Sequence, residues 1–211
     1  MRPVVLSKTL AAASVNDIAQ SQSLGAAGNL ALNGSAVSGG VATLDTQRRI
    51  LITSAGNDSG ITFTVFGATD QGTAIQETVT GANAGAVATN QDFAAVTQVS
   101  ASAATASTVQ VGTNNTGSTR WLLTDQHLTP GNISLGGTVS GSVTYTAEYT
   151  YDDFLNLAAG SFALARTVAG LTNATTSTDA QLGYPVKGVR LTINAGAGAA
   201  ALTVTQAGIK Q

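Results

Sequence analysis

Cysteine is absent from this chain of 211 residues. Its absence excludes disulfide bonds, thiolate catalysis and metal sites with cysteine ligands. Charged residues are also scarce, at 9% of the sequence against roughly a quarter in an average soluble domain. The 9 Lys and Arg residues are scattered, whereas nucleic-acid binding needs several clustered cations to displace counterions. We therefore expect no nucleic-acid partner.

Long apolar runs are missing as well. No segment approaches the ~20 apolar residues that a transmembrane helix needs. Near the N-terminus, Lys8 interrupts the apolar run Val4–Leu6, which is too short for the apolar region of a signal peptide. The sequence therefore predicts no membrane partner. Gly, Ala, Ser and Thr fill much of the chain instead, a composition common in virion proteins and extracellular β-structures and unusual in metabolic enzymes.

What is present is a recurring motif of two alternating apolar runs around a turn of small residues. It reads R-I-L-I-T-S-A-G-N-D-S-G-I-T-F-T-V-F-G over Arg49–Gly67 and V-R-L-T-I-N-A-G-A-G-A-A-A-L-T-V-T-Q-A-G over Val189–Gly208. A looser copy lies over Val96–Gly112. Two runs of period 2 joined by a Gly-rich turn are typical of a β-hairpin, so the motif predicts two or three hairpins.

The clearest single strand lies over Val143–Tyr151, and it is expected to return from a hairpin that begins near Asn132. Its alternate residues on one face are Val143, Tyr145, Ala147, Tyr149 and Tyr151. A period of 2 sustained over nine residues indicates a half-buried antiparallel strand. The segment Ile61–Phe66 alternates in the same way, with Ile61, Phe63 and Val65 on the inner face. Together these patterns predict an all-β fold of antiparallel β-sandwich or jelly-roll-like units built from short hairpins.

The pattern divides the chain into an N-terminal arm and two domains. Residues 1–40 are rich in Ala, Ser, Gly and Asn and predict an extended arm, with a weak alternative of a helix over Asn16–Ser23. Residues 41–112 form the first β-sandwich domain and residues 119–211 the second. The segment Thr113–Ser118 reads T-N-N-T-G-S, which is typical of a linker.

Residues with catalytic or metal-binding chemistry are few. The single histidine, His127, lies near Asp125 in a polar loop, and no nucleophile-elbow motif accompanies it. A zinc site needs further His or Cys ligands. The oxygen-rich turn Asn57–Gly60 lacks the carboxylates of a calcium loop.

Four carboxylates, Glu77, Glu148, Asp152 and Asp153, are candidates for paired acid–base work. Glu148 is expected to face solvent, and the two aspartates end a strand. We therefore expect no catalytic, cofactor-binding or metal-binding residues, no cofactor and no enzymatic activity.

Aromatic residues offer one candidate binding surface. Trp121, Tyr145, Tyr149 and Tyr151 could stack against a carbohydrate. Their alternation favours a different interpretation, in which the tyrosines form the inner face of one sheet and Tyr151 emerges at its edge.

One stretch of the chain resembles a known group of proteins. The sequence L-D-T-Q-R-R-I-L-I-T-S-A-G-N-D-S-G-I-T-F-T-V-F-G-A-T-D-Q-G-T-A-I-Q-E-T-V-T-G, Leu44–Gly81, resembles structural proteins encoded in the virion-morphogenesis regions of tailed bacteriophages. R-W-L-L-T-D from Arg120 and the terminal segment from Val186 look like the same group. This resemblance implies no catalytic residues. Within this group we expect a capsid decoration or cement protein on the outer head surface, because weak contacts repeated on an icosahedral lattice need no deep binding pocket. The alternative is a head–tail connector, collar or tail adaptor, and a host-surface glycan-binding module is less favoured.

The resemblance also sets the expected partners. Edge strands with almost no Lys or Glu to block strand association predict a homo-oligomer, with a trimer favoured. The arm is expected to contact a neighbouring subunit, the major capsid protein or another virion protein. The expected location is the virion, assembled in the cytoplasm of the bacterial host.

Overall fold

The structure is a computed structural model that describes residues 3–129, 131–158, 161–206 and 209–210. All regular elements in these ranges are β-strands, and no helix occurs among them. The strands pair in antiparallel fashion throughout. The predicted all-β, sandwich-like fold is thereby confirmed. The chain forms two compact units: unit 1 contains residues 1–11 and 116–211, and unit 2 contains residues 12–115.

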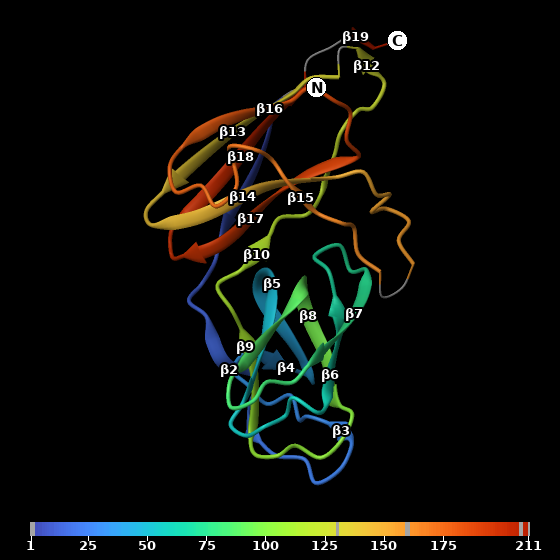
Figure 1. Cartoon of the computed structure of the whole chain (residues 1–211), viewed down its shortest axis with the longest axis vertical. Helices are drawn as coiled ribbons and strands as arrows, with labels where there is room; N and C mark the ends of the chain where they lie inside the picture. The colour runs from blue at the N-terminus through green and yellow to red at the C-terminus, as the bar shows by residue number, and fades with distance from the viewer. Residues whose placement is uncertain (1–2, 130, 159–160, 207–208, 211) are drawn as a thin grey trace. The chain divides into compact units, whose positions relative to one another are not determined.

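Unit 2 is built around one continuous sheet (Figure 1), in which the main strands follow the order β2-β9-β5-β8-β6-β7. The sheet buries a core that includes Phe63, Val65, Phe93 and Val96, all fully inaccessible, and the alternation predicted the first two. The long strand β8 pairs first with β5 and then with β6, so it links the two halves of the sheet. The strands of this unit are β2 (Ser14–Gln22), β3 (Gly28–Asn29), β4 (Val37–Ser38), β5 (Val41–Ser54), β6 (Thr62–Ala68), β7 (Ala74–Thr80), β8 (Ala86–Ala101) and β9 (Val109–Thr113).

A β-bulge in β8 explains an irregularity in the sequence of β7. Alternation within β7 puts Glu77 on the same face as Ile75 and Val79, so a carboxylate interrupts an apolar stripe. The Glu77 carboxylate accepts hydrogen bonds from the backbone amides of Asn90 (2.8 Å) and Gln91 (2.7 Å). The pairing of β8 with β5 shifts register at this place. Strand β7 itself pairs regularly with β6, so the bulge lies in β8.

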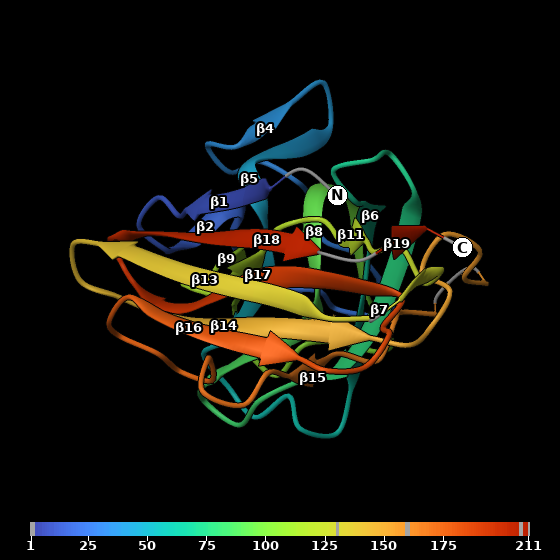
Figure 2. The ribbon, with the colours of Figure 1, turned by 90° about the horizontal axis from the view of Figure 1, so that it is seen from above.

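Unit 1 is a sandwich of two sheets, and Figure 2 shows β18, β13 and β16 side by side in one of them. The sheets have the orders β1-β18-β13-β16 and β10-β17-β14-β15, with β11 also paired to β17. The core between them includes Leu135 and Leu202 from the first sheet and Tyr145 and Leu191 from the second. The strands are β1 (Val4–Thr9), β10 (Gly117–Ser118), β11 (Leu122–Leu123), β12 (Leu128–Thr129), β13 (Ile133–Ser140), β14 (Val143–Thr150), β15 (Arg166–Thr167), β16 (Thr178–Leu182), β17 (Gly188–Gly196), β18 (Ala199–Gln206) and β19 (Ile209–Lys210).

The two sheets of unit 1 arise from one long two-stranded ribbon that folds over. Strand β13 pairs with β18, β14 pairs with β17, and both pairings end at the same place, at Ser140↔Ala199 and Val143↔Gly196. The amide of Gly198 donates to the carbonyl of Ser142 across this bend. Gly196 has φ +97, and a Cβ there would lie 2.4 Å from the Ser142 oxygen. The bend therefore requires glycine.

The recurring motif does not form hairpins. In its first copy β5 and β6 are separated by β8, in the second β17 and β18 belong to different sheets, and in the third β9 pairs with β2 and β5 instead of β8. The segment before Val143 behaves in the same way, since β13 and β14 also lie in different sheets. The predicted hairpins are therefore wrong at these places. We call each motif an arch, because its two strands do not pair with each other. They lie in different sheets on either side of a core, or apart in one sheet.

The N-terminal segment is not an arm. Strand β1 pairs with β18 over six residues, from Val4↔Val204 to Thr9↔Ala199, and β2 pairs with β9. A helix over Asn16–Ser23 was the weak alternative, but residues 16–22 are part of β2. The polar composition misleads here because only Ile18 and Ala19 of β2 are buried, and side-chain amides such as that of Gln22 bond the backbone of Ala31. The expected arm over residues 1–40 is thus divided between the two units, and the chain returns to unit 1 at Thr116.

Candidate functional site

A long loop on unit 1 exposes an unusual concentration of apolar side chains. Residues 151–165 connect β14 to β15, and their described part contains no regular element. Loops of this length inside a compact domain are uncommon and often functional. Of nine large apolar side chains exposed in the described chain, this loop and the segment beside it supply six. We call them the exposed apolar surface: Tyr151, Leu155, Leu157, Phe162, Leu164 and Tyr184.

The base of this loop is anchored to the sandwich by stacked rings. Phe154 stacks on Trp121 with ring centroids 5.9 Å apart. The same ring lies against the backbone of Gly188 in β17, where a Cβ would come within 2.5 Å of it. Arg190 completes the stack, with its guanidinium carbon 4.5 Å from the Trp121 ring centroid. These contacts hold the base of the loop to unit 1.

Two adjacent carboxylates fix the loop further. The Asp152 carboxylate accepts the backbone amide of Leu164 at 2.6 Å, which ties the two ends of the loop together. Asp153 lies 3.2 Å from the Lys187 ammonium and accepts the side-chain amide of Asn156 at 2.7 Å. These hydrogen bonds, led by that of Asn156, lower the pKa of Asp153 below its ordinary value. Both aspartates therefore have structural partners.

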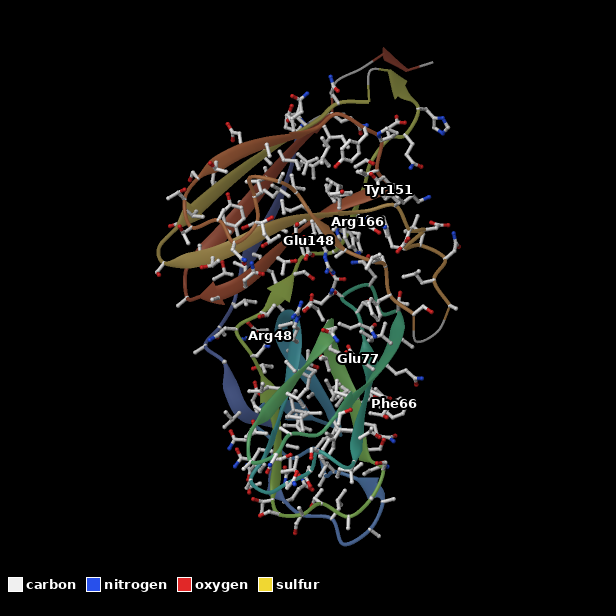
Figure 3. The ribbon with its side chains drawn as sticks, in the orientation of Figure 1. Arg48, Phe66, Glu77, Glu148, Tyr151 and Arg166 are labelled. Carbon is white, nitrogen blue, oxygen red and sulfur yellow. The ribbon has the colours of Figure 1, made fainter. Side chains whose placement is uncertain are left out.

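Three tyrosine rings form the edge of the exposed apolar surface next to the sandwich (Figure 3 labels Tyr151 and Arg166). Tyr149 meets Tyr151 edge-on at 5.6 Å and Tyr184 at 5.8 Å. A hydrogen bond to Tyr149, with burial and the two neighbouring rings, raises the pKa of Tyr184 to about 12. Tyr151 and Tyr184 are 50% and 40% exposed, so these rings are open to a partner.

The sequence interpretation of the tyrosines holds in part. Tyr145 is fully buried, and its hydroxyl donates to the carbonyl of Thr176 at 3.2 Å. Tyr149 packs at the border of the core, and Tyr151 emerges beyond the strand end. Sequence reasoning missed Tyr184, which reaches this cluster from a separate turn. No local spacing indicated Tyr184; the sequence signal at this place was residues 157–171, which contain large apolar residues without strand alternation.

Two arginines have different surroundings at this place. Arg190 donates to the Glu148 carboxylate at 2.7 Å, and the hydroxyl of Thr192 donates to the same carboxylate at 2.8 Å. Glu148 was expected to face solvent, but its side chain is only 13% exposed because these partners enclose it. Arg166 instead lies over the Tyr151 ring, 5.1 Å from its centroid. Its Nη1 is buried and has no hydrogen-bond partner in the described structure.

The other residues considered from the sequence have local structural roles. The ring of His127 is exposed, and the Asp125 carboxylate accepts the backbone amide of His127 at 2.9 Å, which is a turn contact. The Asp58 carboxylate accepts the backbone amide of Ala106 at 2.7 Å, and the side-chain oxygen of Asn57 accepts the backbone amide of Ser59. Within the described residues, no three His, Asp or Glu side chains gather as metal ligands.

Two further features of the chain are a buried arginine and a shallow surface depression. In unit 2, Arg48 is buried and donates to the carbonyl of Asn114 and to Asp45 at 2.9 Å, and burial raises the pKa of nearby Asp17. This cluster holds strands together. A shallow depression of about 540 Å³ lies on the outer face of β13, β16 and β18, lined by Ser134, Leu135, Gly136, Asp179, Ala180, Gln181, Thr203 and Thr205. It is open and lined by both polar and apolar atoms.

Comparisons with known proteins give little guidance. No protein-family model and no curated protein matches the chain. One solved structure, that of infectious bursal disease virus Gx strain, aligns with 98% of this chain and 71% of its own at 12% identity. The TM-score of 0.17 is too low to indicate a shared fold. Across the described residues there is also no helix of the length and hydropathy needed to cross a membrane.

Proposed function

We propose that this chain is a non-enzymatic structural protein of a tailed-phage virion, bound to the outer surface of the head as a decoration or cement protein. The observation that carries this proposal is the exposed apolar surface on a loop with an anchored base. Large apolar patches on soluble proteins are typical of protein–protein contact. Tyrosine, arginine and other large side chains supply most of the binding energy in such contacts.

The composition and the sequence resemblance support the same proposal. The outer faces of the sheets carry Thr, Ser and Gln, for example the paired hydroxyls of Thr64 and Thr78 at 2.9 Å. With a net charge of −2, many copies can pack closely without strong mutual repulsion. A decoration protein binds a repeating lattice, so weak contacts add through avidity and no deep pocket is needed.

Copy number separates this proposal from its alternative, a head–tail connector, collar or tail adaptor. Purified virions of the phage that encodes the chain can be analysed by quantitative mass spectrometry, with the major capsid protein as the internal standard. Hundreds of copies per particle are expected for a decoration protein. Six, twelve or fifteen copies would favour the connector class, and absence from the particle would exclude both.

The exposed tyrosines keep a second candidate function open. Tyr151 and Tyr184 are accessible, as the rings of a carbohydrate-binding surface must be. A host-surface glycan-binding module predicts binding on a glycan array that Tyr184→Ala abolishes. The decoration proposal predicts an array without specific binding.

A further inference from the structure

The exposed apolar surface carries charges of both signs that have no ion-pair partner among the described residues. Arg166 covers one face of Tyr151, and its guanidinium makes no ion pair in the described part of the chain. Asp152 follows Tyr151 directly, and its carboxylate accepts only the backbone amide of Leu164 among the described contacts. One cation without an ion pair thus lies over the Tyr151 ring, and one carboxylate without an ion pair belongs to the next residue in the sequence.

This arrangement is self-complementary. In an interface with twofold symmetry the same patch faces itself, so residue i of one copy meets residue j of the other, and the reverse contact is also made. A twofold axis near Tyr151 would place Arg166 of each copy opposite Asp152 of the other. A foreign acidic partner would satisfy Arg166 and repel Asp152, and a basic partner would do the opposite.

We propose that the exposed apolar surface is the contact between two copies of this chain, with the Arg166 guanidinium of each copy paired to the Asp152 carboxylate of the other. The inference rests on the proposed function only in that both require an assembled protein. Contacts across this twofold axis close at two copies, so this surface by itself makes a dimer. The trimer favoured by the sequence would need a second, different contact. Pairing covers the exposed apolar surface, so the particle would be contacted by other faces of the protein, and a dimer offers two copies of those faces, which increases avidity.

Charge reversal gives the test. The wild-type protein is expected to sediment as a concentration-dependent dimer in analytical ultracentrifugation. Arg166→Asp and Asp152→Arg should each raise the dimer dissociation constant about tenfold or more, because like charges then face each other. An equimolar mixture of the two variants should recover a dimer containing one copy of each, since the opposite charges meet again at both contacts. The double variant should recover a dimer by itself.

Two controls keep the outcome interpretable. Asp70→Arg changes an exposed carboxylate in unit 2 by the same amount of charge and should leave the dimer unaffected. Asp152→Asn keeps an oxygen that can accept the Leu164 amide, so it removes the charge while preserving the loop. Fluorescence of Trp121, the only tryptophan, reports whether the base of the loop is intact in every variant.

Three results would overturn the inference: a wild-type monomer at all concentrations, single variants that dimerise as the wild type does, or a mixture that stays monomeric. None of these depends on the virion. A monomer that is present at hundreds of copies per particle would contradict the dimer and leave the decoration proposal standing. A dimer absent from particles would do the reverse.

Discussion

At the residue scale, Phe63 and Thr62 are neighbours in β6 with opposite surroundings. Phe63 is fully buried in the core of unit 2, and Thr62 lies half-buried on the other face. Phe63→Ala should lower the free energy of unfolding by about 3–5 kcal/mol, because it empties a large core site. Thr62→Ala should cost less than ~1 kcal/mol. Urea denaturation followed by circular dichroism measures both, and equal losses would contradict the face assignment.

The tyrosine cluster gives a residue-scale prediction on pH. The bond to Tyr149 raises the pKa of Tyr184 from 10.0 to about 12, so the folded protein keeps a proton that the unfolded chain loses first. The contribution of Tyr184 to the free energy of unfolding is therefore fully present below pH 10.0 and is lost as the pH rises towards 12. In NMR titrations of labelled tyrosine, Tyr149→Phe should move the Tyr184 pKa back towards 10.0.

The same spectra contain an internal control. Burial raises the pKa of Tyr145, whose hydroxyl bonds Thr176 away from the cluster. Its titration should not change in Tyr149→Phe. If Tyr149→Phe left the pKa of Tyr184 unchanged and shifted that of Tyr145, the rings of Tyr149 and Tyr184 would not interact as described.

At the scale of elements, the bend of the folded ribbon depends on Gly196. Gly196→Ala places a Cβ 2.4 Å from the Ser142 oxygen at a φ of +97, which side chains rarely adopt. We expect a loss of at least about 2 kcal/mol in unit 1. Gly183 has open space around it, so Gly183→Ala should change stability by less than ~1 kcal/mol. Unfolding monitored by Trp121 fluorescence compares the two variants, and similar stabilities would show that the bend tolerates a side chain.

Sequence patterns predicted the strands themselves well and their partners poorly. Alternation identified β14, β6 and β18 and the buried faces of Phe63 and Val65, because a period of 2 is local to each strand. It could not distinguish a hairpin from an arch, since both need two alternating runs around a small-residue turn. The difference lies in which side of the core the second strand reaches, and that is set by contacts distant in sequence.

The candidate site shows the same limit. The sequence indicated that Tyr151 would emerge at a strand end, which it does. The ring of Tyr184 and the guanidinium of Arg166 come from separate segments, and their approach to Tyr151 depends on the packing of β15 and of the turn before β17. No local spacing encodes such an approach.

At the scale of the whole molecule, the division of residues 1–40 between two units changes the effect of truncation. Deleting them removes β1 with Leu6 and Leu10 from the core of unit 1, and β2 with Ile18 from that of unit 2. We expect loss of cooperative thermal unfolding and poor solubility. In each unit a sheet loses its edge strand, which leaves an unpaired strand at the edge and exposes the core. Deleting residues 1–3, which precede β1, should leave the melting transition unchanged. A soluble, cooperatively unfolding protein without residues 1–40 would contradict the strand assignments.

The pairing of β1 with β18 also constrains how the protein is made. Val4 pairs with Val204, so β1 must wait for a partner strand that leaves the ribosome about 200 residues later. At about 5–20 residues per second, the wait lasts roughly 10–40 s. All strands of unit 2 emerge within that interval, so unit 2 can finish folding while β1 remains exposed. Synthesis therefore imposes an order of folding on the chain. Unit 2, whose residues are inserted within the sequence of unit 1, folds first, and unit 1 pairs β1 with β18 last.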